Sequence, residues 1–401
     1  MIRHSYLLLL LIAWPAPSAV AQGAPVPALA ADEIQRVLTL GPWPPAIKPD
    51  PSNRVSGKIQ AIELGRRLFR DSRMSPVGYI ACVTCHQPDR SFTDLKARAH
   101  GLADLPRNTP ALANLRQQHW FGWGGSNDSL WMASIRPMLD AREFDSNPAI
   151  VTRIFERDPE LAACYRKVFR ESPRHNPERT VVNVGKALAA FEETLVTGRT
   201  PFDDYRDALA RGDVVATKAY PVAARRGLKL FVGRAGCVNC HAGPNFSDGE
   251  FHPGVATATP MVPIDAALNV VRTAVDTGRL EGAQSLQSSP LNLLGRYNDD
   301  RARANAVATR QLRVHAGMRG EFRTPSLRNV LVTAPYMHDG RFDRLHEAIQ
   351  HIPLSSTGAT APSSSRLLAD QVDDLAAFLA TLTDQYGERR PWSAEPLASC
   401  P

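Results

Sequence analysis

Apolar residues recur at helical spacing in four stretches of the chain, whereas the alternating pattern of a β-strand is scarce. The four stretches cover residues 58–69, 181–195, 223–232 and 367–382. In the second stretch, steps of three and four place one set of side chains on a single helical face: Val181, Val184, Leu188, Phe191 and Leu195. This spacing indicates that Phe191 belongs to a core. The pattern as a whole predicts a mainly α-helical protein.

The other stretches also predict helices, although their apolar residues follow the helical spacing less regularly. The first places Ile59, Ile62 and Phe69 near one face, and the last predicts these inward positions: Leu368, Val372, Leu375, Phe378 and Leu379. Residues 252–320 show no strong periodicity and predict a long irregular segment with one short helix. A segment of that length without regular structure is usually functional or wraps another part of the molecule.

Composition and the N-terminus narrow the class of protein. The 401 residues include 43% hydrophobic and 22% charged residues, as in soluble globular proteins, and the length suggests two or three domains. The 32 prolines exceed the usual share of about 5% and predict many helix ends. Arg3, an apolar run and Ala19-Val20-Ala21 form a secretory signal peptide over residues 1–21, which predicts a periplasmic protein.

Two partner classes receive no support from the sequence. Beyond residue 21 no apolar run is long enough to cross a membrane. The formal net charge is +7, but no basic run is interleaved with aromatic residues, so nucleic-acid binding is not expected. The modest basicity is compatible with an acidic protein partner.

The cysteines carry the strongest chemical signal. Cys82-Val83-Thr84-Cys85-His86 and, about 155 residues later, Cys237-Val238-Asn239-Cys240-His241 both follow the pattern C-x-x-C-H. This is the attachment signature of c-type haem. Two thiols on one short turn can bond the vinyl groups of a single porphyrin, and the adjacent imidazole can bind its iron. The sequence therefore predicts two covalently bound haem c groups, with His86 and His241 as iron ligands.

Other uses of these cysteines fit less well. Paired C-x-x-C motifs of zinc sites usually lie about 15–20 residues apart, and a redox C-x-x-C needs a βαβ context that is not seen here. Cys164 and Cys400 remain outside the motifs. They either pair in a disulfide or stay free, and the sequence does not distinguish these alternatives.

A family resemblance follows from longer blocks of sequence. The blocks include LGRRLFRDSRMS, CVTCHQPDRSFTD, PRNTPALAN, GLKLFVGRAGCVNCHAGPNFSDG and FRTPSLRNVLVTAPYMHDGRFDRLHEAI. Through them the chain resembles bacterial dihaem cytochrome c peroxidases and the related methylamine-utilisation (MauG-type) dihaem enzymes. The resemblance implies two cytochrome c-like haem domains packed against each other, with long irregular connections. LGRRLF and RGLKLF, each preceding one C-x-x-C-H motif, further predict an internal repeat.

The resemblance implies a domain order along the chain. After the signal peptide, residues 22–200 would form the N-terminal cytochrome c-like domain with the peroxidatic haem. Residues 201–385 would form the C-terminal domain with the electron-transfer haem, and residues 386–401 a tail.

The resemblance also implies catalytic residues. Trp123 matches a tryptophan between the two haems that can relay an electron, with a plain core aromatic as the alternative. Glu143 matches a glutamate of the peroxide pocket, where a carboxyl with a raised pKa can move a proton between the peroxide oxygens. Pro137 matches a proline that shapes this pocket.

Three positions depart from the family pattern. Ala133 stands where the family usually has a glutamine that hydrogen-bonds peroxide. Leu102 stands where many relatives have a histidine that blocks the first haem, so we expect an open site unless the nearby His100 takes that role. Ile352 stands where the family has the distal iron ligand of the second haem, a methionine or a tyrosine. Because isoleucine cannot bind iron, the adjacent His351 is a candidate ligand, and a surface histidine is the alternative.

The family further implies a calcium ion between the domains. Asn108 matches its side-chain ligand, and the backbone oxygens of Thr333 and Pro335 match the others. Oxygen ligands of this kind suit calcium. Asn108 taken alone would be a loop or capping residue.

Three functions are consistent with these residues. The first is an oxidoreductase of the cytochrome c peroxidase type, which reduces hydrogen peroxide with electrons from a small c-type cytochrome or cupredoxin. The second is a MauG-like enzyme that oxidises residues of a partner protein. The third is a dihaem electron carrier without catalysis. A homodimer is an expected assembly.

Overall fold

The computed structural model of the chain describes residues 28–46, 48–253, 276–352 and 366–384, with four short backbone strands between residues 254 and 275. The expected signal peptide (1–21), the tail (386–401) and Cys400 lie outside the described residues. Cys164 is buried and disulfide-bonded. Of the two alternatives for this residue, the free thiol is therefore excluded. No described helix is long and apolar enough to span a bilayer.

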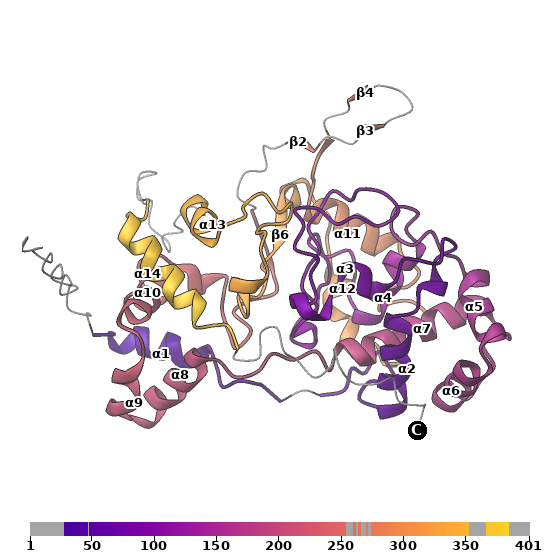
Figure 1. The fold of residues 1–401 in the computed structure, drawn as a ribbon, viewed down its shortest axis with the longest axis horizontal. Helices are drawn as coiled ribbons and strands as arrows, with labels where there is room; N and C mark the ends of the chain where they lie inside the picture. The colour runs from indigo at the N-terminus through magenta and orange to yellow at the C-terminus, as the bar shows by residue number, and fades with distance from the viewer. Residues whose placement is uncertain are drawn as a thin grey trace, which may run out of the picture.

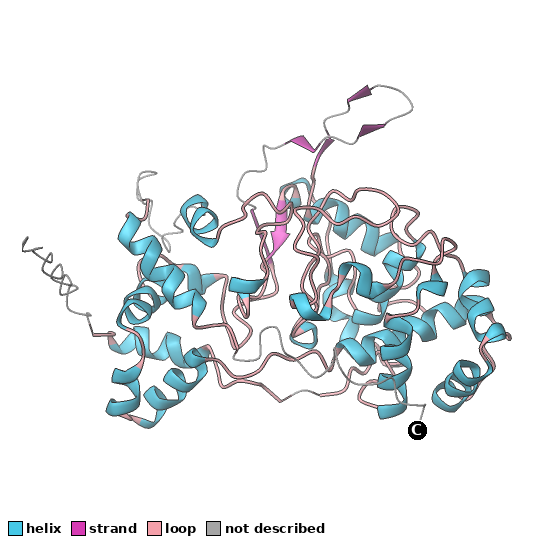
Figure 2. Cartoon of the chain, viewed as in Figure 1, coloured by secondary structure: helices cyan, strands magenta, loops and turns pink. Residues whose placement is uncertain are grey.

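The chain forms two helical lobes that lie side by side (Figures 1 and 2). The first lobe contains α2 (Ile59–Phe69), α3 (Cys82–Cys85), α4 (Leu130–Leu139), α5 (Pro148–Arg157), α6 (Pro159–Phe169), α7 (Pro177–Glu192), α11 (Arg279–Ser288) and α12 (Val307–Gln311). The second lobe contains α1 (Ala31–Thr39), α8 (Pro201–Arg211), α9 (Val214–Ala219), α10 (Val222–Val232), α13 (Leu345–His351) and α14 (Ala369–Ala380). Each lobe has its own buried apolar cluster.

Strands are few and short, as the sequence indicates. The pair β1 (Phe251–Pro253) and β6 (Glu321–Arg323) is antiparallel, with Phe251 opposite Arg323. Two further antiparallel pairs join β2 (Pro260–Met261) to β5 (Ala274–Val275) and β3 (Ile264–Asp265) to β4 (Val270–Val271). Short 3-10 turns connect the other elements: Ser72–Met74, Pro88–Arg90, Leu115–Gln117, Cys237–Asn239, Ala304–Ala306, Ala316–Met318 and Val330–Val332.

The same helix pair lies at the centre of each lobe, namely α2 with α7 and α10 with α14. A glycine permits the contact in both pairs. A Cβ atom added to Gly65 would lie 1.9 Å from the carbonyl oxygen of Ala187, and one added to Gly227 would lie 1.9 Å from that of Asp374. Phenylalanine pairs pack beside both contacts: Phe69 with Phe191 and Phe231 with Phe378. The repeat expected from LGRRLF and RGLKLF is therefore present in three dimensions.

Proline marks the start of several helices. A proline lacks the N–H that the first turn leaves unpaired, and its φ angle suits a helix. Four helices begin in this way, each after a polar residue whose side chain caps the first turn: Asn147-Pro148, Asp158-Pro159, Asn176-Pro177 and Thr200-Pro201.

The division of the chain differs from the expected boundaries at two places. Val37 and Leu40, around the end of α1, belong to the core of the second lobe, although residues 22–200 were expected to form the first. Conversely, α11 and the residues after it pack on the first lobe, where Asp128 accepts hydrogen bonds from Leu293 N–H (2.9 Å) and the Thr309 hydroxyl (2.7 Å). Within the segment expected to be irregular, residues 279–312 therefore wrap the first lobe.

Other differences concern helices and single side chains. Residues 279–311 contain two α-helices, α11 and α12, where one short helix was expected. Ile59 is 55% exposed and Leu368 is 64% exposed, although both were assigned to inward faces. Ile59 is the first residue of α2 and Leu368 precedes α14, so neither is surrounded by a complete helical turn.

Candidate functional site

The first C-x-x-C-H motif lies on α3, a single helical turn. The N–H of His86 donates to the carbonyl of Cys82 at 2.9 Å, which folds the imidazole back over the turn. Its Nδ1 lies 3.0 Å from the carbonyl oxygen of Phe92. Because a carbonyl only accepts hydrogen bonds, Nδ1 carries the proton and Nε2 keeps a free lone pair. Burial lowers the pKa of His86, so the ring is neutral and suited to bind a metal.

The second motif repeats this arrangement on the 3-10 turn Cys237–Asn239. The N–H of His241 donates to the carbonyl of Cys237 at 2.9 Å, and Nδ1 lies 3.0 Å from the carbonyl oxygen of Phe246. Burial again lowers the pKa of this histidine. An imidazole whose outer nitrogen is fixed by a carbonyl is the usual arrangement for a metal-binding histidine.

All four motif cysteines are free thiols, and none is bonded to its neighbour in the motif. Burial raises the pKa of each, which keeps them as thiols. Two uncrosslinked thiols on one turn, next to a neutral imidazole, fit the attachment of haem c. Among the described residues, one further group could bind a metal ion, namely Cys240, Asp248 and His252. Because Cys240 is part of the second C-x-x-C-H motif, this group belongs to that motif.

Trp123 lies in a loop between the two motifs. Its indole N–H donates to the carbonyl of Asn108 at 2.9 Å, and its own carbonyl accepts from the backbone N–H of Arg323 at 2.9 Å. The carbonyl of Thr324, the next residue, accepts from the hydroxyl of Ser247, which follows the second motif. The loop is thus linked, through Arg323 and Thr324, to the segment that follows the second motif.

The side chain of a buried arginine, Arg279, also contacts the Trp123 loop. Arg279 donates to the carbonyl of Gly125 at 2.8 Å, and its guanidinium lies 4.6 Å from the ring centre of Trp120 and 3.9 Å from that of Phe251. Cation–π contacts of this kind stabilise a buried guanidinium. A Cβ on Gly125 would collide with Phe251, so the loop needs glycine at this position.

Glu143 lies near the first motif, after α4. Its carboxylate raises the pKa of both Cys82 and Cys85, although burial is the larger cause for each thiol. Burial raises the pKa of Glu143 itself, while Arg136, whose guanidinium lies 3.7 Å from the carboxylate, lowers it. Gly101 packs against the backbone of Glu143 so closely that a Cβ would lie 2.7 Å from its Cα atom.

The first lobe also contains Pro137 and two of the three positions that depart from the family pattern, Ala133 and Leu102. Pro137 lies inside α4, and its carbonyl accepts from the N–H of Phe144. Ala133 is a half-buried residue of the same helix, and Leu102 packs against the first core. The exposed His100 places Nδ1 2.6 Å from a carboxylate oxygen of Asp104. One nitrogen of the His100 ring is therefore already engaged.

Sequence reasoning did not single out two buried acids at the end of α7. Burial raises the pKa of both Glu192 and Glu193 to about 7. Glu192 lies near the first motif, because it is the second largest cause of the raised pKa of Cys82. The hydroxyl of Ser134 lies 3.0 Å from its carboxylate. Two adjacent acids directly after the apolar run ALAAF were the available signal.

The remaining candidate ligands lie in the second lobe and at the junction. His351 ends α13, is exposed, and has its ring centre 4.8 Å from that of Phe342. Ile352 follows it and is 45% exposed. Iron binding by His351 stays a prediction.

The residues expected to bind calcium lie in neighbouring segments. The N–H of Asn108 donates to the carbonyl of His338 at 2.8 Å, which brings it to the segment that contains Thr333 and Pro335. The side-chain nitrogen of Asn108 donates to the carbonyl of Lys96, so its oxygen is the atom that could bind a cation. Calcium binding also stays a prediction.

Comparisons with known proteins agree with this geometry. A family model described as di-haem cytochrome c peroxidase matches residues 59–211. The methylamine utilization protein MauG of Methylorubrum extorquens is 32% identical over 80% of this chain and 78% of its own length. The chain belongs to the di-haem cytochrome c peroxidase and MauG family. Membership implies two haem groups, which matches the two motifs.

Both branches of the family are represented among the relatives. Cytochrome-c peroxidase IdrP2 of Pseudomonas sp. (strain SCT) is 30% identical over 86% of this chain and 85% of its own length. The crystal structure of a MauG-like protein associated with microbial copper homeostasis superposes with a TM-score of 0.62 at 25% identity, covering 89% of this chain and all of that one. The fold of two cytochrome c-like lobes is thus confirmed, and the chain is an oxidoreductase of the di-haem peroxidase type.

Proposed function

We propose that this protein reduces hydrogen peroxide to water at its first motif, in the periplasm, with electrons that enter at the second motif. The overall reaction consumes one peroxide, two electrons and two protons and yields two waters. When bound, the haem iron supplies the site for peroxide and stores electrons. The observation that carries the proposal is Glu143, a half-buried carboxyl with a raised pKa whose charge acts on both Cys82 and Cys85.

The chain's own residues support the proton chemistry. A carboxyl whose pKa is raised toward neutrality exchanges protons readily and can take one from the first peroxide oxygen and return it to the second. The Arg136 guanidinium, 3.7 Å from Glu143, can orient the carboxylate and replace in part the donor that Ala133 does not provide. Leu102 cannot bind iron, and the His100 ring is engaged by Asp104, so these contacts support an open first site.

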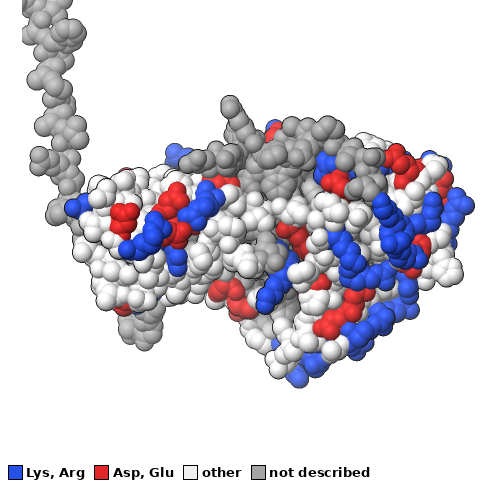
Figure 3. All heavy atoms as spheres, turned by 90° about the horizontal axis from the view of Figure 1, so that it is seen from below, with Lys and Arg blue, Asp and Glu red and all other residues white. Residues whose placement is uncertain are grey.

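The junction supports electron transfer between the motifs. The indole of Trp123 is bonded to Asn108 and its backbone to Arg323, and these two bonds hold the ring in one position. We propose that it relays electrons from the second motif to the first. The electron donor is a small c-type cytochrome or cupredoxin. Basic side chains interspersed with acidic ones on one face of the first lobe (Figure 3) are compatible with an acidic partner.

The test uses the purified holoprotein with both haems attached and calcium supplied. We expect peroxide-dependent oxidation of a reduced small c-type cytochrome, and a high-spin ferric signal from the as-isolated protein in electron paramagnetic resonance. Failure to oxidise any reduced cytochrome or cupredoxin would exclude the peroxidase proposal. A purely low-spin, six-coordinate spectrum would exclude the open site.

A MauG-like role is the second candidate, and two observations favour it. The relative at 32% identity is a MauG, and Leu102 replaces the histidine that blocks the first haem in many peroxidases. In this role the oxidised substrate would be a residue of a partner protein. The test is whether peroxide produces a long-lived oxidised form with near-infrared absorption that decays only when a protein substrate is added. Rapid decay with a reduced cytochrome favours the peroxidase.

A further inference from the structure

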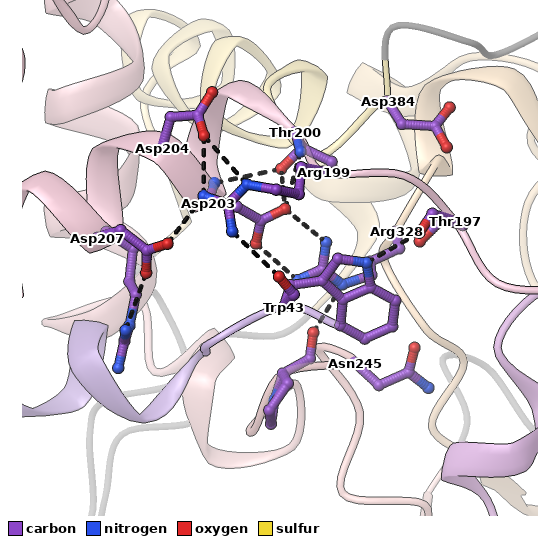
Figure 4. Close-up of polar contacts among 12 residues, drawn as sticks. Trp43, Thr197, Arg199, Thr200, Asp203, Asp204, Asp207, Asn245, Arg328 and Asp384 are labelled. Atoms are coloured by element: carbon purple, nitrogen blue, oxygen red, sulfur yellow. Dashed lines mark hydrogen bonds and ion pairs between the residues drawn. The ribbon is translucent and has the colours of Figure 1, made fainter. Parts of the chain in front are cut away.

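Most buried cationic side chains of the described chain lie against a carboxylate. Arg66 contacts Glu63 at 2.7 Å and Lys186 contacts Asp299 at 2.6 Å. Arg328 lies between the Trp43 ring and Asp203, whose two oxygens it contacts at 2.9 and 3.1 Å (Figure 4). This pattern follows from physics, because an unpaired charge in the protein interior is strongly destabilising.

Arg323 departs from this pattern. It is 6% exposed, and its guanidinium donates only to backbone carbonyls, at 3.3 Å to Gly122 and 3.4 Å to Thr324. Among the described residues no carboxylate lies within ion-pair distance of it, and burial alone lowers its pKa, to about 10. A guanidinium is charged at neutral pH even then. An anion that compensates this charge is therefore missing from the polypeptide described here.

Arg279 provides a useful contrast, because it is equally buried and also contacts the Trp123 loop. Its guanidinium stacks on two aromatic rings, and the charges of Glu250 and Glu321 favour its ionised form. For Arg323 neither kind of compensation is present among the described residues. Its environment is that of a binding site for an anion rather than that of a structural ion pair.

The position of Arg323 indicates which anion binds. It lies on β6, opposite Phe251 of β1, and β1 follows the second motif in sequence. The next residues bond to the chain just after that motif: the Thr324 carbonyl accepts from Ser247, and the Ser326 hydroxyl donates to the carbonyl of Asn245. The side chain of Arg323 is thus at the boundary between the second motif and the Trp123 loop.

We propose that Arg323 binds a propionate carboxylate of the haem attached at Cys237 and Cys240. A planar guanidinium pairs with a carboxylate through two parallel hydrogen bonds, which suits a buried anion. The pair also joins the second haem to the Gly122–Trp123 backbone, which Arg323 contacts through both its side chain and its N–H. The proposal depends on haem attachment, which is part of the proposed function, but not on peroxide as the substrate.

The test compares midpoint potentials of the two haems in the holoprotein. Arg323→Gln removes the positive charge, Arg323→Lys keeps it, and Arg319→Gln is the matched control, since Arg319 is an exposed arginine on the same segment. Each haem is followed in a redox titration by its own electron paramagnetic resonance signal. Mass spectrometry verifies that both haems are attached to every variant.

We expect Arg323→Gln to lower the ratio of reduced to oxidised second haem about tenfold at a fixed potential, because a nearby positive charge favours the reduced iron. For a one-electron couple this is about 59 mV. Arg323→Lys should retain most of the wild-type ratio, and Arg319→Gln should change it less than twofold.

Three outcomes would overturn the assignment. In the first, Arg323→Gln shifts the second haem no more than Arg319→Gln does. In the second, Arg323→Lys shifts it as much as Arg323→Gln, which indicates a structural role in holding the Gly122 carbonyl. In the third, only the first haem responds. None of these readouts depends on peroxide turnover, so failure of the peroxidase proposal would be seen separately.

Discussion

Replacement of Glu192 by glutamine should stabilise the folded protein at alkaline pH. Glu192 is 7% exposed, and among the described residues its side chain has one hydrogen-bond partner, the hydroxyl of Ser134. That hydroxyl also lies 2.8 Å from the carbonyl of Leu130. Because a hydroxyl has one hydrogen, both contacts are satisfied together when Glu192 is protonated and donates to Ser134. Glutamine retains a donor at this position without a charge.

The magnitude follows from the pKa of Glu192. Burial raises it from 4.5 to about 7, and each pH unit corresponds to 1.36 kcal/mol, so the ionised form destabilises the fold by about 3 kcal/mol. Between pH 4.5 and 7 the folded protein binds more protons than the unfolded chain. The free energy of unfolding therefore falls as pH rises through this window, and the loss is complete above pH 7. The raised pKa of Glu193 makes the free energy of unfolding fall with pH in the same way, and the Glu192→Gln variant keeps this contribution.

The assay is guanidinium-induced unfolding of the ferric holoprotein, followed by circular dichroism at pH 5 and pH 8. Glu192→Gln should resemble the wild type at pH 5 and exceed its unfolding free energy by about 3 kcal/mol at pH 8. Glu178→Gln, at an exposed position of the same helix, should change stability by less than about 1 kcal/mol at either pH. If Glu192→Gln is no more stable than the wild type at pH 8, Glu192 is an ionised group with a counter-charge, and the reasoning is wrong.

Three further substitutions test the site and the fold. Glu143→Gln should slow peroxide-dependent oxidation of a reduced cytochrome by roughly 10²–10⁴-fold at unchanged haem content, and a loss below tenfold would argue against proton transfer by Glu143. Trp123→Phe should slow electron transfer between the haems, measured after rapid photoreduction of the second haem; an unchanged rate would remove Trp123 from the path. Gly227→Ala should destabilise the protein by about 1–3 kcal/mol in thermal or chemical unfolding, because its Cβ meets the Asp374 carbonyl. Gly317→Ala, which meets only the His315 side chain, should have little effect.

The helices of the central pairs could be predicted from sequence because their signals are local. The stretches expected at 58–69 and 223–232 match α2 and α10 to within one residue. The stretch expected at 181–195 begins earlier in the structure, at Pro177, because the Asn176 side chain caps the N–H of Arg179. Apolar spacing reports which face is buried, whereas the helix start depends on a capping residue outside the apolar pattern.

The wrapping of α11 and α12 around the first lobe could not be read from the sequence in the same way. Their attachment depends on Asp128, whose hydrogen-bond partners Leu293 and Thr309 are far away in the chain. A buried carboxylate that bonds a backbone N–H has no periodicity to detect. The same holds for α1, whose Val37 enters the second core through contacts with distant helices.

The functional site likewise contains residues that the sequence predicts and residues that it does not. The haem motifs are contiguous in sequence, so their residues can be identified from the sequence alone. The carbonyls that fix His86 and His241 come from Phe92 and Phe246, and neither could be assigned to this role from its residue type, since any backbone carbonyl would serve. The burial of Arg323 without a carboxylate partner depends on contacts with Gly122 and Phe251, which are far away in the chain.

The two lobes share one helix pair and one histidine–carbonyl bond, yet they differ in the acids around the motif. Near the first motif lie Glu143 and Glu192, both with a raised pKa. The Arg136 guanidinium lies 3.7 Å from Glu143, whereas Glu192 has no ion-pair partner among the described residues. Near the second motif, Asp248 is bonded to His252 at 2.7 Å. A carboxyl whose pKa is raised by burial can accompany electron transfer with proton transfer. This asymmetry supports peroxide chemistry at the first motif and electron entry at the second.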